Sequence, residues 1–177
     1  ACGDADGAVT GNTRRFGASL DKIKQVVNVR DGEIMFGLNM VVHKGKNIFV
    51  GDTSVHEYPT SEQLAEIAIS TSRVVRLFGF DPKVAFVSHS TFGQPLTSRT
   101  KHIRKAVDIL KEKKVNFEFD GDMQPDVALN SDYEELYPFS EIVGKANILI
   151  MPGQHSAAIS YKMMKTLGET KVIGPLL

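Results

Sequence analysis

The stretch that decides the fold runs from residue 59 to residue 87 and reads PTSEQLAEIAISTSRVVRLFGFDPKVAFV. Thr60 and Gln63 form a capping box, the pattern that begins a helix by satisfying two otherwise unpaired backbone N–H groups. Apolar residues then recur at helical spacing, and Gly79 with Pro82 closes the helix. The apolar run at the end of the stretch predicts a strand that follows the helix directly.

On both sides of this helix and strand, the rest of the chain alternates between helical and strand patterns. Helical spacing predicts helices over residues 19–29, 60–78, 98–113 and 156–167. Apolar runs predict strands over residues 6–10, 34–42, 47–50, 84–87, 115–119, 148–151 and 171–173, with a hairpin turn at 44–46. Strands that alternate with helices predict an α/β fold with a mostly parallel sheet and flanking helices.

The composition excludes several classes of function. The 21 basic and 21 acidic residues cancel, and no basic cluster with interleaved aromatics occurs, so we expect no nucleic-acid partner. No apolar run approaches the roughly 18 residues that span a bilayer, so we expect no membrane partner. The single cysteine, Cys2, favours a reducing compartment such as the cytoplasm. The ends, Ala1 without Met and a strand-like Ile173–Leu177, lead us to expect an incomplete part of a longer polypeptide.

Three loops are candidates for ligand binding, because ligands of open α/β sheets bind beyond the carboxyl ends of strands. They span residues 11–16, 88–98 and 152–156. In the first, Thr13, Arg14 and Arg15 offer a hydroxyl and two guanidinium groups. They either hold a phosphate through charge-assisted hydrogen bonds or form a solvated basic turn.

The second loop carries hydroxyls and a glycine just before a helix. Such a loop suits an anion, through backbone N–H groups and the helix dipole, or it simply caps the helix. A Ser–His nucleophile is disfavoured, because neighbours on an extended strand point to opposite faces and no G-x-S-x-G motif occurs. The candidate cleft residues in this loop and at the start of the helix are Ser88, Ser90, Thr91, Gly93 and Ser98.

A carboxylate-rich segment, residues 120–126, reads as a turn. Asp120, Gln124 and Asp126 either line a cleft or hold the turn, and carboxylates that cap the next helix explain them better than a metal site does. The five histidines show no metal-ligand spacing, so no metal site is assigned. Neither a Walker A loop nor a G-x-G-x-x-G motif occurs, so we expect no nicotinamide cofactor on this chain and assign no catalytic residue.

Several stretches resemble the phosphate acetyltransferase (phosphotransacetylase) family, in order along nearly the whole chain. They include ADGAVTG at residues 5–11, FGFDPKVA at 78–85 and DGDMQPD at 120–126. The resemblance implies two α/β subdomains, as in isocitrate and isopropylmalate dehydrogenases, with a cleft for CoA and acetyl phosphate, in a homodimer or higher homo-oligomer. By that pattern, residues 1–29 end the first part of subdomain 1. Residues 30–172 form the inserted subdomain 2, and residues 173–177 begin the return to subdomain 1.

Three short segments resemble one branch of the family, the C-terminal domain of hybrid NADP-dependent malic enzymes. They are Arg15-Phe16, SHSTFG at 88–93 and SAAIS at 156–160, with Thr91 and Arg14 departing from that branch's pattern. This resemblance implies a regulatory and oligomerisation domain that binds acetyl-CoA as an allosteric effector. NADP and a divalent metal would belong to the parent enzyme, which converts malate to pyruvate and CO₂. The alternative is a catalytic phosphate acetyltransferase, which makes acetyl phosphate and CoA from acetyl-CoA and phosphate.

Overall fold

The computed structural model describes residues 6–11, 13–29 and 32–177, and it divides into two units at residue 33. In the first unit, helix α1 (Phe16–Val26) buries Ser19 and Leu20. The strand predicted for residues 6–10 is wrong, since the described residues from 6 to 11 are irregular. A strand requires a neighbour for its N–H and C=O groups, and no described residue of this unit pairs with them.

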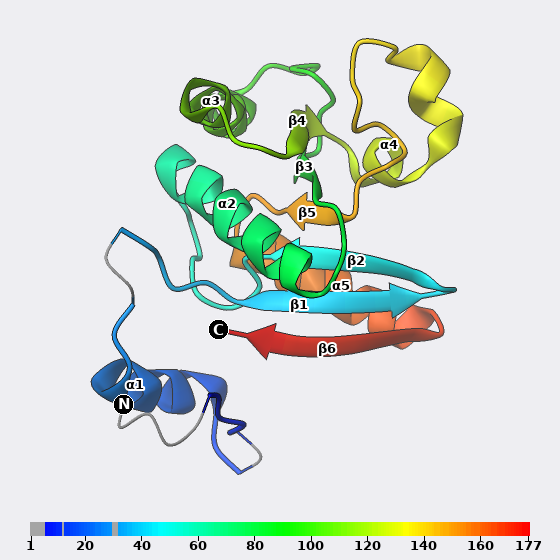
Figure 1. Ribbon diagram of the computed structural model, residues 1–177. Coiled ribbons are helices and arrows are strands. Elements are labelled where there is room, and N and C mark those ends of the chain that lie inside the picture. Colours follow the sequence, from blue (N-terminus) through cyan, green and yellow to red (C-terminus); the bar gives the residue numbers. More distant parts are fainter. Residues whose placement is uncertain (1–5, 12, 30–31) are drawn as a thin grey trace. The chain divides into compact units, whose positions relative to one another are not determined.

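The second unit is built on a six-stranded sheet in the order β4-β3-β5-β2-β1-β6 (Figure 1). Its strands are β1 (Leu38–His43), β2 (Lys46–Gly51), β3 (Lys83–Val87), β4 (Glu118–Met123), β5 (Ile148–Ile150) and β6 (Thr170–Leu176). The pairs β2–β5, β3–β5 and β3–β4 are parallel. The pairs β1–β2 and β1–β6 are antiparallel.

The sheet is therefore mixed, which corrects the prediction of a mostly parallel sheet. The predicted hairpin itself explains half of the difference, because the tight turn at Lys44 and Gly45, both with positive φ, forces β2 to run antiparallel to β1. After α5, strand β6 returns along β1 in the antiparallel sense as well. The strands from β4 at the edge to β2 keep the parallel arrangement of βαβ units.

Four predicted helices are present, with shifted ends in some cases. In the second unit they are α2 (Ser61–Leu77), α3 (Ser98–Lys113) and α5 (Gln154–Leu167). The capping box predicted at Thr60 and Gln63 is confirmed, and Thr97 forms a second one with Thr100 at the start of α3. A short helix, α4 (Pro125–Leu129), begins at the end of the acidic segment, but its N-cap residue is Gln124 and makes no side-chain capping bond, so the expected capping by carboxylates is wrong. The 3-10 helix η1 (Ser131–Leu136) was not predicted.

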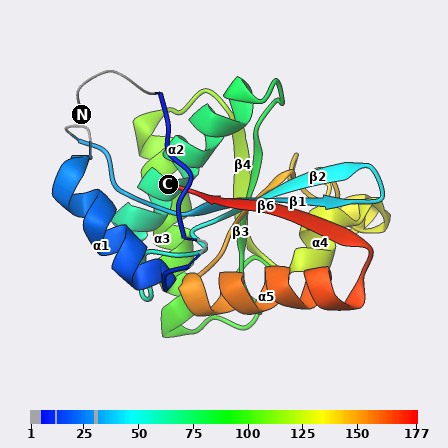
Figure 2. The same ribbon diagram turned by 90° about the horizontal axis from the view of Figure 1, so that it is seen from below.

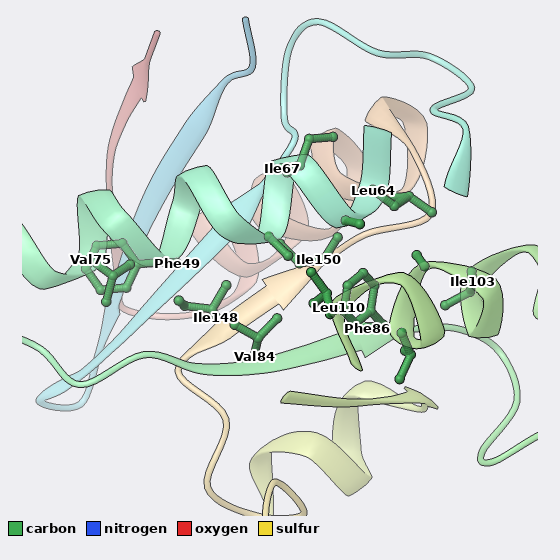
Figure 3. Close-up of a cluster of buried hydrophobic side chains, with 14 of the residues drawn as sticks. Phe49, Leu64, Ile67, Val75, Val84, Phe86, Ile103, Leu110, Ile148 and Ile150 are labelled. Carbon is green, nitrogen blue, oxygen red and sulfur yellow. The ribbon is translucent and has the colours of Figure 1, made fainter. Parts of the chain in front are cut away.

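Two apolar layers enclose the sheet, because successive strand side chains point to opposite faces. On one face, Phe49, Phe86 and Ile150 pack with residues of α2 and α3 such as Leu64 and Leu110 (Figure 3). The other face carries the alternate strand residues and is covered by α4, α5 and the segment before β5. Figure 2 shows α5 on the side of the strands opposite α2.

Residues 120–123 belong to β4 and do not form a turn, which corrects the interpretation of the carboxylate-rich segment. Gly121 lies against Phe86 on β3 so closely that an added Cβ would meet the Phe86 carbonyl oxygen at 2.7 Å. Only glycine permits this approach at φ +146°. Among the described residues, no helix has both the length and the apolar character that crossing a membrane requires.

Candidate ligand-binding site

A cavity of about 310 Å³ lies at the carboxyl ends of β3 and β5, beside the first turn of α3. This is the edge of the sheet where ligands of such folds bind. We call it the edge pocket. It is lined by Val87, Ser88, His89, Arg99, Ile103, Pro125, Met151, Pro152 and Ser156.

A buried carboxylate, that of Asp122 at the end of β4, bonds the loop that follows β3. Asp122 is fully buried, and its side chain accepts hydrogen bonds from the Ser90 hydroxyl and, at 3.1 Å, from the Gly93 N–H. Its main-chain oxygen accepts from the Phe92 N–H at 2.6 Å. The guanidinium of Arg104 on α3 lies 3.8 Å from the same carboxylate. The loop is thus tied to both β4 and α3.

Ser88 is the hydroxyl that this arrangement leaves facing the edge pocket. It lies at the end of β3 and is only 7% exposed. Its Oγ has two hydrogen-bond neighbours, the Ser90 Oγ and N atoms, each at 3.4 Å. Both distances exceed the usual range of protein hydrogen bonds. The buried Ser88 hydroxyl therefore retains hydrogen-bonding capacity for a ligand.

The N-terminus of α5 forms another wall of the edge pocket. Unlike α2 and α3, it begins at a residue without a capping side chain, Gly153. A Cβ at Gly153 would collide with the carbonyl oxygen of Glu57, so the close approach of the 52–59 loop requires glycine there. Gln154 donates its N–H to the His56 carbonyl oxygen at 3.0 Å. Ser156, two residues further in the same first turn, lines the pocket.

The 52–59 loop that supports α5 is organised by another buried carboxylate, Asp52, at the carboxyl end of β2. Its oxygens accept from the backbone N–H groups of Gly37, Ser54, Val55 and His56 at 2.7 to 3.1 Å. They also bond the His56 imidazole at 2.7 Å. Burial alone would raise the pKa of Asp52, but the hydrogen bonds from the His56 side chain and from these backbone groups outweigh it and lower the pKa.

This lowered pKa predicts an acid-sensitive contribution to stability. Because the folded state depresses the Asp52 pKa below its usual value of 3.8, its stabilisation is present above that pH and is lost as the pH falls through the folded pKa. We expect the difference in unfolding free energy between the wild type and Asp52→Asn to shrink as the pH falls from 5 to below about 3.8. Urea unfolding across this pH range measures it. A difference that did not change with pH would contradict the assignment.

The predicted residues of the second loop divide into two groups. Ser88 lines the edge pocket. Ser90, Thr91 and Gly93 are buried behind it, where Ser90 and Gly93 bind Asp122 and the Thr91 hydroxyl accepts from the Gln124 N–H at 3.2 Å. Ser98 is exposed at the start of α3 and is not among the lining residues.

The predicted acidic-segment residues have structural partners within the described part of the chain. Asp120 accepts from the Gly121 N–H at 2.8 Å, and Asp126 accepts from the Tyr133 hydroxyl at 3.3 Å. Gln124 precedes α4 and donates its side-chain amide to the His89 carbonyl oxygen at 3.1 Å. Among residues 6–11, 13–29 and 32–177, no group of three or more His, Cys, Asp or Glu side chains gathers as a metal site would.

The predicted phosphate contacts of the first loop lie in the first unit. Thr13 and Arg14 line a hollow of about 540 Å³ together with Val9, Thr10 and Gly11. Arg15 is the N-cap residue of α1 and makes no side-chain capping bond. Their part in ligand binding stays a prediction.

Four polar or flexible side chains of the edge pocket were not predicted individually: His89, Arg99, Met151 and Ser156. The loop 152–156 was recognised as a candidate from its place after a strand, but its residues were not singled out. Arg99 carried an available signal, since it stands in the first turn of a helix that follows a candidate loop, where an anion would lie.

Comparison with known proteins assigns the family. The family model described as phosphate acetyl/butaryl transferase matches residues 1–177, the whole chain. The chain belongs to this family. The fold agrees, because a phosphotransacetylase from Streptococcus pyogenes superimposes with a TM-score of 0.87 at 26% identity, over 94% of this chain and 52% of that one.

Within the family, the relatives include two kinds of enzyme. An NADP-dependent malic enzyme from Rhizobium meliloti is 45% identical over 177 residues, which are the whole of this chain and 23% of that protein. The phosphate acetyltransferase of Bacillus subtilis is 32% identical over 99% of this chain and 55% of that protein. The chain therefore spans about a quarter of the length of the malic enzymes and about half of that acetyltransferase.

Proposed function

We propose that this chain is the regulatory and oligomerisation domain of an NADP-dependent malic enzyme and that it binds acetyl-CoA as an allosteric effector. The higher identity to malic enzymes than to phosphate acetyltransferases, 45% against 32%, supports the choice of parent enzyme. The malic-enzyme-like segments at residues 88–93 and 156–160 also support a malic enzyme as the parent. Both of these segments contribute residues to the edge pocket.

The observation that carries the proposal is the chemistry of the edge pocket. Its walls are apolar at Val87, Ile103 and Met151, while its polar groups are hydroxyls, an imidazole and a guanidinium. The hydroxyl of Ser88 has a second serine as its neighbour in place of a general base. Such a site is suited to holding an amphipathic anion such as a CoA ester, and within the described residues the Ser88 hydroxyl has no hydrogen bond to a base that would activate it.

The remaining parts of the proposal concern the parent polypeptide. We place residues 30–172 in an inserted subdomain and residues 1–29 and 173–177 in its partner, with an architecture like that of isocitrate and isopropylmalate dehydrogenases. NADP, a divalent metal and the malate site would lie elsewhere in a cytoplasmic parent. Regulation then requires two states of the parent that differ in affinity for acetyl-CoA.

The proposed homo-oligomer has support from α5. Its side chains Ile159, Met163 and Leu167 recur at intervals of four residues, so they share one side of the helix, and each is more than half exposed. Contiguous exposed apolar surface marks an interaction site in a soluble protein. Sedimentation velocity of the parent polypeptide tests this part, and a monomer at micromolar concentration would contradict it.

Malate-dependent NADPH formation by the intact parent, with and without acetyl-CoA, tests the function. We expect acetyl-CoA to reduce the rate at subsaturating malate about fivefold or more, the size of ordinary allosteric coupling. Acetate at the same concentration is the control and should have no effect. Malate turnover that acetyl-CoA does not alter would contradict the regulatory role. Release of CoA from acetyl-CoA and phosphate, without malate turnover, would instead establish the catalytic acetyltransferase.

A further inference from the structure

Arg99 differs from most other cationic side chains of α3 in having no partner. Lys105 bonds Glu62 at 2.7 Å, Lys113 bonds Glu66 at 3.0 Å, and Arg104 lies 3.8 Å from Asp122. Within the described residues, Arg99 makes neither an ion pair nor a side-chain hydrogen bond, although it lines the edge pocket. Its guanidinium is therefore available to an anion that enters this cavity.

The surroundings of Arg99 favour one part of a CoA ester over the other. The acyl thioester end offers a guanidinium only neutral acceptors, whereas the nucleotide end carries phosphates, which arginine binds through paired, charge-assisted N–H donors. Arg99 stands in the first turn of α3, and Ser156 stands in the first turn of α5, which lacks a capping side chain. The dipoles of both helices add to the attraction for a negative group.

The size of the edge pocket points in the same direction. Its volume of about 310 Å³ is at the lower end of the roughly 300–1,000 Å³ of small-molecule pockets, so it holds one ring system and its substituent, not a whole coenzyme. The apolar surfaces of Ile103 and Met151 suit a flat aromatic base. The buried Ser88 hydroxyl, whose neighbours are at 3.4 Å, offers that base or its ribose a hydrogen bond.

We propose that the edge pocket receives the adenosine 3′-phosphate end of the CoA ester, with the 3′-phosphate on Arg99 and the adenine between Ile103 and Met151. This inference rests on the proposed function and specifies which end of the ligand the pocket recognises. The acyl group then lies outside the pocket. The edge pocket accordingly recognises the nucleotide end of the coenzyme and does not select for the length of the acyl chain.

Calorimetric titration of the intact parent tests the inference with two probes, acetyl-CoA and 3′-dephospho-acetyl-CoA. We expect the dephospho probe to bind the wild type about tenfold to a hundredfold more weakly, the usual worth of a hydrogen-bonded charge pair. Arg99→Gln should weaken the binding of acetyl-CoA by a similar factor and leave the affinity for the dephospho probe unchanged. Adenosine 3′,5′-bisphosphate should compete with acetyl-CoA on the wild type.

Lys101→Gln is the matched control, because Lys101 is a cation on the same helix that has no ion pair with any described residue and does not line the edge pocket. It should bind acetyl-CoA like the wild type. Equal affinity of the wild type for the two probes, or equal weakening by Arg99→Gln and Lys101→Gln, would overturn the inference and leave the proposed function standing. Failure of the wild type to bind acetyl-CoA at all would overturn the proposed function itself.

Discussion

Replacing Asp122 by alanine should both destabilise the fold and abolish ligand binding at the edge pocket. The substitution leaves the buried Ser90 hydroxyl and Gly93 N–H without an acceptor. An unsatisfied buried donor costs about 1–3 kcal/mol, so we expect the free energy of unfolding to fall by about 3 kcal/mol. The loop from Ser88 to Thr97 loses the two hydrogen bonds to the Asp122 side chain, and we expect the shape of the pocket to change. Urea unfolding and acetyl-CoA titration measure the two effects.

Asp126→Ala is the control for this experiment. Asp126 lies four residues further along, is exposed, and has one long hydrogen bond, from Tyr133 at 3.3 Å. Its substitution should change the unfolding free energy by no more than about 0.5 kcal/mol. If Asp122→Ala behaved like this control in both stability and binding, the role of Asp122 in fixing the loop would be wrong.

Asp52→Ala should have an even larger effect on stability. Four backbone N–H groups and the His56 imidazole converge on this carboxylate, and the residue is 1% exposed. At about 1 kcal/mol or more for each donor left without an acceptor, the expected loss is about 4 kcal/mol. This loss amounts to a large share of the stability of an ordinary domain. Thermal or urea unfolding monitored by circular dichroism measures it.

Two further variants separate the causes of that loss. Asp52→Asn keeps one acceptor oxygen for the backbone donors but turns an NH₂ group toward other donors. Its free energy of unfolding should therefore lie between those of the wild type and Asp52→Ala. Asp108→Ala removes a carboxylate that, within the described residues, has an exposed salt bridge to Lys111 and no other, and it should cost about 1 kcal/mol or less. If Asp52→Ala lost no more unfolding free energy than Asp108→Ala, this result would contradict the stabilising role of the hydrogen bonds to Asp52.

The elements that the sequence predicted well are those whose signals are local. The capping box at Thr60 and Gln63, and the turn at Lys44 and Gly45, depend on residues a few positions apart, and both are present. The sheet order, with β5 between β3 and β2, depends on which strands, distant in sequence, pair edge to edge through backbone hydrogen bonds. No local pattern carries that information.

Strand β4 shows where local reasoning fails. Asp120, Gly121 and Asp122 have low strand propensity, so the segment reads as a turn. In the structure, Gly121 is required because Phe86 lies so close to it. The Asp122 carboxylate accepts hydrogen bonds from Ser90 and Gly93, which lie some thirty residues away in sequence. Tertiary partners thus override the local preference.

The same contacts explain the outcome for the candidate site. The place of the site, beyond the carboxyl ends of the strands, follows from a topological rule and could be predicted. Which hydroxyl faces the cavity could not, because Ser88 and Ser90 have the same chemistry and only Asp122 draws one of them inward. Arg99 is distinguished because it lines the pocket and has no ion pair among the described residues, which only the positions of Glu62, Glu66 and Asp122 reveal.

Hydrogen–deuterium exchange of the intact parent, with and without saturating acetyl-CoA, tests the central claim most directly. We predict slower exchange in residues 88–101 and 152–157, which contain the pocket loops and the first turns of α3 and α5, with no change in β1 or β6. Saturable acetyl-CoA binding that leaves both of these segments unprotected would contradict the assignment of the edge pocket as the effector site.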